Sequence, residues 1–199
     1  MPSRDSDTEK KIIDTAMTVF FTEGRLHATT QDIADAAGVS RTLLHYYFRS
    51  RNILFETVTQ MALDQARKDL NTVLESPIDF CKKIETFIDV FQKRINHYPY
   101  LENFVITELN AHAVVKYDSP NKKKSSALFA QFLDEIEQQM NNGVLHKMKP
   151  IHFMFNLFAL MVYPNLVKPL NMKFFNISET QYTKLMKERK KVIMGIIFI

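Results

Sequence analysis

The sequence predicts an all-α protein, on three observations. Only 4 of the 199 residues are glycine, against 16 phenylalanines and 10 methionines, so turn residues are scarce and large apolar side chains are common. Apolar residues recur at spacings of three and four along most of the chain, as they do on one face of a helix. Residues that cap helices precede several of these stretches. We therefore expect a small N-terminal domain of three helices, followed by a larger C-terminal helical domain.

The stretch from Thr29 to Gly38 predicts one short helix. Thr29 and Asp32 stand three apart, which is the spacing of a capping box that satisfies the free amides of a new helix. The helix should begin at about Thr30 and end at Gly38, because glycine adopts the left-handed conformation without steric cost. A sharp turn should follow.

A second short helix should begin after Ser40, which can cap it. Leu44 and Phe48 lie four apart and should face inward. The outward residues are then cationic, hydroxyl-bearing and aromatic: Arg41, Thr42, His45, Tyr46 and Arg49. Two short helices joined by a glycine turn, with such an outward face, match the geometry that places a recognition helix in the DNA major groove.

The remaining helices are marked by caps and prolines. Ser6 and Glu9 have capping-box spacing and predict the start of a first helix that runs to Gly24. Ser50 should cap a long helix that ends near Glu75, and Pro77 should open the next one. Pro150 and Ser178 should begin the last two helices, of which the first is apolar almost all round.

Charge supports a nucleic-acid partner only locally. The chain carries a net charge of +4, but the segment from Met1 to Phe55 holds as many anions as cations. From Ala36 to Phe55 there is no acid, while Arg41, Arg49 and Arg51 all fall there. Affinity for DNA should therefore depend on a few placed residues.

Several classes of protein are disfavoured by the sequence. Cys81 is the only cysteine, which excludes an internal disulfide and fits a reducing cytosol. No apolar run follows the charged start, and the apolar segment 151–162 is shorter than the roughly 18 residues of a membrane span. We expect a cytoplasmic protein without a membrane partner.

The order of these features resembles the TetR family of bacterial transcriptional regulators. The resemblance is concentrated in Lys11 to Phe55, and beyond Phe55 only the number and order of helices are similar. Three segments carry it: IIDTAMTVFFTEG, ATTQDIADAAGVS and LLHYYFRSRNILF. The resemblance implies a DNA-binding domain at 1–50 and an effector-binding and dimerisation domain at 51–199, bridged by a helix at about 51–75.

The resemblance also implies which residues meet DNA. Arg41, Thr42 and Leu43 should face base edges, where arginine can take guanine bidentately and leucine can meet a thymine methyl. Phosphate contacts are expected from the residues at positions where members of the family contact phosphates: Thr29, Thr30, His45, Tyr46, Tyr47 and Arg51. Ser40 joins the expected site as the cap of the recognition helix. Thr42 replaces a frequent glycine and His45 a frequent tyrosine, which puts the operator sequence in question more than DNA binding. Glu9 stands where an arginine is frequent and would repel a phosphate, so the first helix is left out of the expected site.

The implied protein is a ligand-responsive repressor that binds a near-palindromic double-stranded operator as a homodimer, joined by its last two helices. A small hydrophobic or amphipathic effector would bind the larger domain and shift the bridging helix. Side chains expected to line its pocket are Phe80, Phe87, Phe91, Phe104, Glu108, His112, Phe129, Phe132, Met154 and Phe158. The alternative for each aromatic residue is ordinary core packing.

Two other functions compete with this interpretation. Glu108 and His112 stand four apart, with His146 and His152 beyond them, so an acid-base or metal site is conceivable. No recognised catalytic motif supports one, and we expect no enzymatic activity, cofactor or metal. The second alternative is a helical module of the same fold that binds small molecules or proteins without specific DNA binding.

Overall fold

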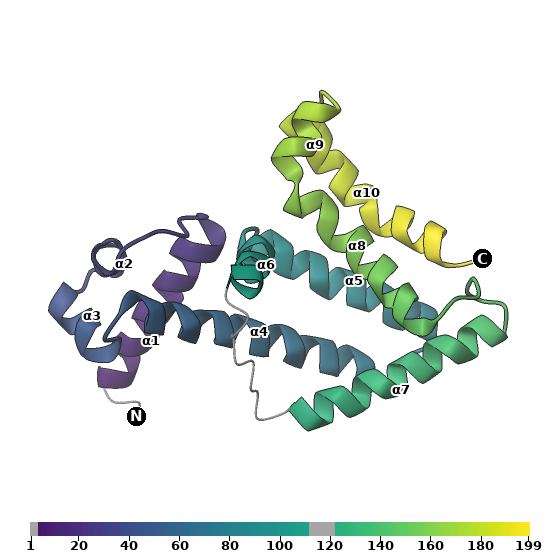
Figure 1. The fold of residues 1–199 in the computed structure, drawn as a ribbon, viewed down its shortest axis with the longest axis horizontal. Coiled ribbons are helices and arrows are strands. Elements are labelled where there is room, and N and C mark those ends of the chain that lie inside the picture. The colour runs from purple at the N-terminus through teal and green to yellow at the C-terminus, as the bar shows by residue number, and fades with distance from the viewer. Residues whose placement is uncertain (1–3, 112–121) are drawn as a thin grey trace. The chain divides into compact units, whose positions relative to one another are not determined.

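The computed structural model describes residues 4–111 and 122–199, and within them every element of secondary structure is a helix (Figure 1). The expected all-α fold is therefore confirmed. The elements are α1 (Arg4–Met17), the π-helical turn η1 (Thr18–Thr22), α2 (Thr30–Ala37), α3 (Arg41–Tyr47), α4 (Arg51–Glu75), α5 (Phe80–His97), α6 (Leu101–Ala111), α7 (Lys122–Asn141), α8 (Pro150–Leu166), α9 (Lys168–Phe174) and α10 (Glu179–Ile197).

The described residues form two compact units. One holds residues 4–66 and 95–111, and the other holds residues 67–94 and 122–199. Helix α4 is continuous from Arg51 to Glu75 and supplies residues to both units. The expected division at residue 50 is a division by function, and it stays a prediction.

Aromatic residues form the centre of the N-terminal unit. Phe20 and Phe21 are fully buried. Phe20 meets Phe55 of α4 edge to face at 5.0 Å, and Phe55 meets Phe104 of α6 at 4.1 Å. Each such ring contributes about 1.5 to 3 kcal/mol by leaving water. This core fixes α1, η1, α4 and α6 as one body, onto which α2 and α3 pack.

The turn η1 explains how Val19, Phe20 and Phe21 can all be buried. Successive residues of an α-helix are spread widely around its axis, whereas the wider π-helical turn spreads them less. The hydrogen bond typical of a π-helical turn is present, because the Glu23 amide donates to the carbonyl of Thr18, five residues earlier, at 2.9 Å. The sequence pattern predicted an ordinary helix to Gly24, so the π-helical turn was missed.

Two hydrogen bonds join η1 to the turn before α6. The Tyr100 amide donates to the Phe21 carbonyl at 3.0 Å, and the Thr22 hydroxyl donates to the His97 carbonyl at 3.0 Å. The Tyr100 ring also lies against Gly24, whose φ of +72° is left-handed. A side chain at Gly24 would therefore meet both backbone strain and the tyrosine ring.

Arg51 ties α4 to the segment before α2. Its Nε donates to the Ala28 carbonyl at 2.8 Å and its Nη2 donates to the Leu26 carbonyl. The guanidinium also stands over two buried rings, 5.5 Å from the Phe20 centroid and 5.2 Å from the Phe55 centroid. The position of the chain just ahead of α2 thus depends on Arg51.

The C-terminal unit has its own aromatic core. Phe80 of α5 packs against Phe132 of α7 at 6.1 Å and Phe153 of α8 at 6.5 Å. Beside them, Lys83 is buried and its Nζ lies 2.7 Å from Glu135 Oε2. The ion pair satisfies a charge that would otherwise be costly to bury.

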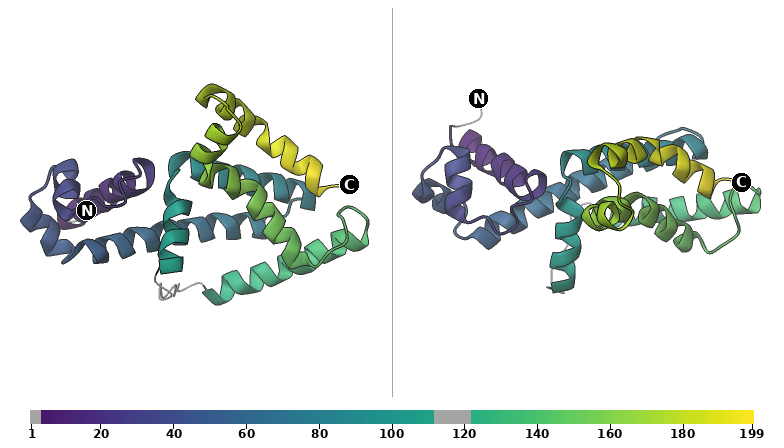
Figure 2. Two further views of the ribbon diagram at one scale, coloured as in Figure 1. Left: turned by 45° about the horizontal axis from the view of Figure 1, so that its top comes forward. Right: turned by 90° about the horizontal axis from the view of Figure 1, so that it is seen from above.

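Helix α10 runs antiparallel to α8, with α9 between them in the chain (Figures 1 and 2). The Tyr182 hydroxyl donates to the Pro164 carbonyl at 2.6 Å. Pro164 lies inside α8 and has no amide hydrogen, so the Leu160 carbonyl lacks its usual helical donor. Arg189 replaces that donor, with Nε at 3.0 Å and Nη2 at 2.9 Å from the Leu160 oxygen.

Some predicted helix ends are confirmed and others are wrong. Ser178 and Gln181 form the expected capping box, and Pro150 opens α8. Helix α1 begins at Arg4, before Ser6. Helix α5 begins at Phe80 rather than Pro77, because the Asp79 carboxylate accepts from the Lys82 amide at 2.9 Å and caps it there.

Helix α9 was not predicted at all. Among the described residues, no single helix has the length and apolar content to cross a membrane, although α8 and α9, bent by 75°, pass such a test as a pair.

Gly24→Ala should lower the free energy of unfolding by about 1 to 3 kcal/mol, since the substitution adds strain at a positive φ and a contact with the Tyr100 ring. Urea titration followed by circular dichroism measures the change. Gly195→Ala is the control, because a Cβ there would contact nothing beyond its chain neighbours and its own helix backbone, and the residue is helical. That variant should be neutral or up to about 1 kcal/mol more stable. Equal stability of the two variants would contradict the prediction.

Arg51→Ala should destabilise the protein by about 2 kcal/mol, because the Leu26 and Ala28 carbonyls and two ring faces lose a charged partner. Arg51→Lys should recover only part of this stability, since an ammonium cannot present a planar pair of donors. The same urea titration tests both variants. The exposed neighbour Arg49 supplies the control, as Arg49→Ala should leave stability unchanged within about 0.5 kcal/mol.

Candidate nucleic-acid interface

The capping box that begins α2 is present in full. The Asp32 amide donates to Thr29 Oγ1 at 3.2 Å, while the Thr29 amide and hydroxyl both donate to Asp32 Oδ2 at 2.7 Å. These two hydrogen bonds, the hydroxyl first, hold the pKa of Asp32 below its usual value, and Arg25 adds to the effect. The start of α2 is therefore fixed by its own residues.

The turn between α2 and α3 is fixed by Gly38. Its φ of +63° is left-handed, and its amide donates to carbonyls of the last turn of α2. Ser40 then caps α3, accepting from the Leu43 amide at 3.1 Å. Both features were predicted and are confirmed.

Helix α3 turns one face inward. Leu44 is fully buried and Phe48 is 4% exposed, as expected. Five residues on its other sides are exposed: Arg41, Thr42, Leu43, His45 and Tyr46. The geometry is that of a helix-turn-helix with a free second helix, and the contact of these residues with DNA stays a prediction.

The two tyrosines of α3 differ in their surroundings. Tyr46 is 71% exposed, whereas Tyr47 is half-buried and packs against the core of the N-terminal unit. Their rings meet edge to face at 5.2 Å. Tyr46 is therefore free to reach a partner, while Tyr47 helps to hold it in place.

Several residues expected at phosphates already have structural roles. Thr29 is engaged in the capping box, and Thr30 is half-buried at the first position of α2. Ser40 was expected as a cap and not at a phosphate, and its hydroxyl accepts from the Leu43 amide in that role. Arg51 is half-buried with two of its nitrogens on carbonyls, so we revise its expected role from phosphate contact to positioning of the segment before α2.

Lys11 is a cation that was not among the residues predicted for the site. Its Nζ lies 3.7 Å from the place that a Cβ would take at Gly38, so it stands beside the turn of the helix-turn-helix. With exposed Arg41 and Arg49, it brings positive charge to this surface. Because of Glu9, the first helix had been left out of the expected site for DNA. The sequence pattern does not show which face of α1 meets the turn, so it did not show that Lys11 lies there.

The aromatic residues expected around an effector are mostly in the C-terminal core. Phe80, Phe87, Phe91, Phe132 and Met154 are buried, and Phe129 and Phe158 are half-buried. The Phe158 ring packs against Phe87 at 5.7 Å and against Phe91 at 6.1 Å. Their role as ligand contacts stays a prediction.

Phe104 does not belong with that set. It packs at 5.7 Å from Phe21 and 4.1 Å from Phe55, in the core of the N-terminal unit. The spacing of apolar residues along a helix predicts that Phe104 is buried, but it does not predict which of the two cores contains it. His112 and the side chain of Glu108 lie outside the described residues. Elsewhere in the chain as described, no three His, Cys, Asp or Glu side chains are grouped to hold a metal ion.

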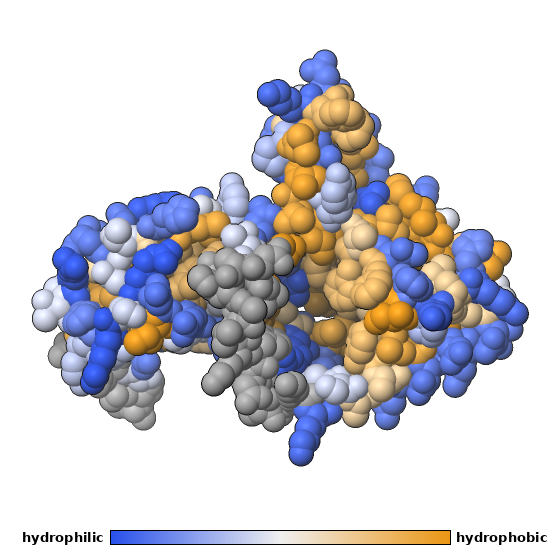
Figure 3. Space-filling model, viewed as in Figure 1, coloured by the Kyte–Doolittle hydropathy of each residue, from blue (hydrophilic) through white to orange (hydrophobic). Residues whose placement is uncertain are grey.

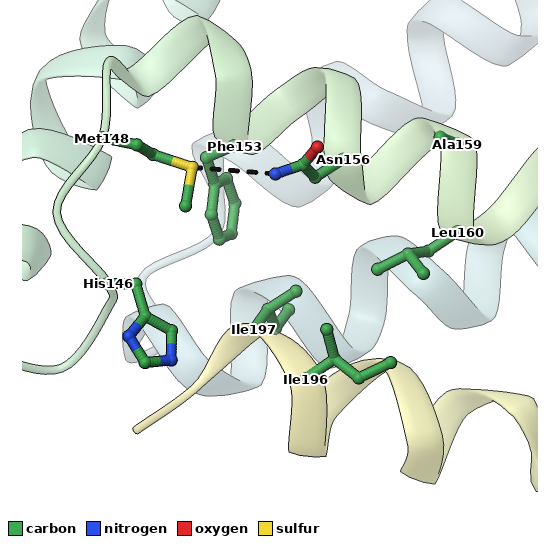
Figure 4. Close-up of a pocket in the computed structure, with 8 residues that line it drawn as sticks. All are labelled: His146, Met148, Phe153, Asn156, Ala159, Leu160, Ile196 and Ile197. Carbon is green, nitrogen blue, oxygen red and sulfur yellow. Dashed lines mark hydrogen bonds between the residues drawn. The ribbon is translucent and has the colours of Figure 1, made fainter.

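A cavity of about 250 Å³ lies between α8, α10 and the segment that precedes α8 (Figure 4). The sequence did not predict it, because its walls come from segments that are well separated along the chain. The lining residues are His146, Met148, Phe153, Asn156, Ala159, Leu160, Ile196 and Ile197.

Comparison with known proteins agrees with this geometry. The model of "Bacterial regulatory proteins, tetR family" matches residues 12–58, which contain the helix-turn-helix. The HTH-type transcriptional regulator BetI of Agrobacterium fabrum is 39% identical over 59 residues, 29% of each chain. The uncharacterized HTH-type transcriptional regulator YvdT of Bacillus subtilis is 26% identical over 115 residues, 58% of this chain and 53% of its own length. The chain thus matches about half the length of one curated relative and under a third of the other.

Solved structures share the fold over nearly the whole chain. A TetR family transcription regulator from Marinobacter aquaeolei VT8 aligns with 100% of this chain and 99% of its own, with a TM-score of 0.61 and 14% identity. A TetR-family protein from a Rhodococcus species aligns with 95% of this chain and 100% of its own, with a TM-score of 0.60 and 18% identity. Residues 12–58 thus match the DNA-binding segment of the tetR family of bacterial regulatory proteins, and the chain as a whole shares the fold of these solved TetR-family structures.

Proposed function

We propose that the protein is a transcriptional regulator that binds double-stranded DNA through α3. The observation that carries the proposal is the arrangement of α3: Leu44 and Phe48 anchor it, while Arg41, Thr42 and Tyr46 face solvent. A helix of this kind fits the major groove, and side chains near its start reach base edges. The names of the curated relatives, both HTH-type transcriptional regulators, support the same function.

Each exposed residue has a proposed task. Arg41 donates two hydrogen bonds to a guanine, Thr42 bonds an adjacent base, and Leu43 contacts a thymine methyl. Tyr46 and Lys11 bind phosphates on the two sides of the groove and set the register. Because acids balance cations from Met1 to Phe55, the affinity for DNA rests on these few contacts.

A homodimer is proposed from the surface of the last helices. Hydrophobic residues gather over α8 and α9 on the face that Figure 3 presents. Phe155 of α8 is 61% exposed and Ile196 of α10 is 51% exposed, and Ile151, Tyr163 and Val192 are also exposed. An apolar surface of this kind on two packed helices is typical of a self-association site. A two-fold dimer would place two copies of α3 on half-sites about 34 to 36 Å apart.

Ligand response and repression complete the proposal. The C-terminal unit is rich in apolar side chains and contains a cavity, which supports a small amphipathic effector. An effector acts only if it binds two states of the protein with different affinity.

The function is tested by selecting sequences from a pool of random DNA duplexes with the purified protein. The expected product is a near-palindrome of two half-sites, bound less tightly as salt rises because phosphate contacts release counterions. Arg41→Ala should weaken binding to the selected duplex by about 1 to 3 kcal/mol and relax the preference at one base pair of each half-site. Fluorescence anisotropy measures both effects.

Two further variants sharpen this test. Arg41→Lys keeps the charge and should still relax the base preference, because lysine cannot bind guanine through a planar pair of donors. Lys187→Ala removes an exposed cation of α10 and should change nothing. Enrichment of no sequence at low salt would overturn the proposed function, and an unchanged preference in Arg41→Ala would overturn the assignment of that residue.

Phe155→Glu should convert the dimer to a monomer at micromolar concentration, because a charge would be buried at the proposed interface. Size-exclusion chromatography with light scattering gives the mass. Gln138→Glu adds the same charge at an exposed position of α7 and should remain a dimer. A monomeric wild-type protein, or a dimeric Phe155→Glu variant, would contradict the proposed interface.

A further inference from the structure

We propose that the cavity between α8 and α10 binds a small amphiphile, an apolar chain that ends in a carboxylate. The head would lie near His146 and Asn156, and the chain would extend toward Leu160 and Ile196. This inference rests on the proposed ligand response and gives it a place and a ligand class. The place differs from the aromatic core in which the family resemblance implied an effector.

The polar end of the cavity offers donors with weak partners. Within the described residues, the His146 side chain makes no hydrogen bond or ion pair. The Asn156 amide nitrogen donates to the Met148 sulfur at 3.7 Å, and a thioether is a weak acceptor. In Figure 4, His146 and Met148 lie at one end of the cavity and the amide of Asn156 points toward Met148. A carboxylate oxygen is a stronger acceptor than the sulfur and would replace it.

The charge around this end favours an anion. No Asp or Glu side chain lines the cavity. Two lysines, Lys147 and Lys149, flank Met148 in the chain and are exposed. A carboxylate would therefore enter a region of positive potential, whereas an ammonium head would meet repulsion.

The other end of the cavity suits a short hydrocarbon chain. Ala159, Leu160 and Ile196 bound it, and Phe153 and Ile197 form its buried walls. The volume of about 250 Å³ is slightly below the roughly 300 to 1,000 Å³ of sites for drug-sized ligands. A chain of about eight carbons is accordingly the size we test. Its burial would contribute about 25 cal/mol for each Å² of apolar surface removed from water.

The cavity opens on the face proposed for dimerisation, since Asn156, Ala159 and Ile196 are exposed residues of α8 and α10. A second copy of the chain is thus the competing occupant. The Phe155→Glu variant separates the two, because Phe155 does not line the cavity.

Isothermal titration calorimetry of the full chain with octanoate tests the proposal. We expect a Kd of about 0.1 to 1 mM, the range for a ligand of roughly ten non-hydrogen atoms. Octanol, which has the chain without the charge, should bind at least about fivefold more weakly, and acetate should not bind. Equal binding of octanoate and octanol would overturn the carboxylate head.

Matched variants locate the site. His146→Leu should weaken octanoate about tenfold and leave octanol unchanged, because only the head loses a donor. His152→Leu removes another exposed histidine, which does not line the cavity, and should bind octanoate as the wild type does. Ala159→Phe should weaken both ligands by filling the chain end. Wild-type affinity in both His146→Leu and Ala159→Phe would overturn the site.

Two outcomes distinguish the cavity from the proposed regulation. If octanoate does not bind the wild type at about 10 mM, or binds only the Phe155→Glu variant, the cavity is not a ligand site in the dimer. The proposal that α3 binds DNA is not affected by this outcome. If octanoate binds and the affinity for the selected duplex does not change, the ligand site is supported, but the proposal that this ligand regulates DNA binding is overturned.

Discussion

The guanidinium of Arg51 links α4 to two earlier parts of the N-terminal unit. It lies over the Phe20 and Phe55 rings, which belong to η1 and α4, and it binds the Leu26 and Ala28 carbonyls of the segment before α2. That segment ends at Thr29, which caps α2. Helices α2 and α3 pack on the core of the N-terminal unit through Ile33, Ala34 and Leu44, and Arg51 adds an anchor at the segment that leads into α2. The proposed site for DNA is therefore supported by a half-buried charge that lies over two aromatic rings.

Local signals in the sequence were sufficient for much of this site. The Thr29 and Ser40 caps, the left-handed Gly38 and the inward Leu44 follow from residue types at fixed spacing, and all four are present. Capping and helical periodicity are decided within a few residues, so a single sequence contains them.

What the sequence could not supply depends on contacts between distant residues. The role of Arg51 needs the Leu26 and Ala28 carbonyls, and the burial of Phe104 needs Phe21, which lies far earlier in the chain. The cavity of α8 and α10 likewise forms only when the helices pair. The π-helical turn η1 was hidden for a related reason, since tertiary packing against α6 stabilises a local geometry that propensity disfavours.

Pro164 has a consequence for the order in which the C-terminal unit folds. The last turns of α8 leave the Leu160 carbonyl without a helical donor, and Arg189 completes it from 29 residues further along the chain. During synthesis those turns emerge before their partner, so they cannot reach full stability alone. Closure of the loop that contains α9 and completion of α8 should then be a single late event. A truncated chain that lacks α10 would leave this end of α8 frayed, and a nascent protein would acquire its α8 and α10 surface only after Arg189 has been added.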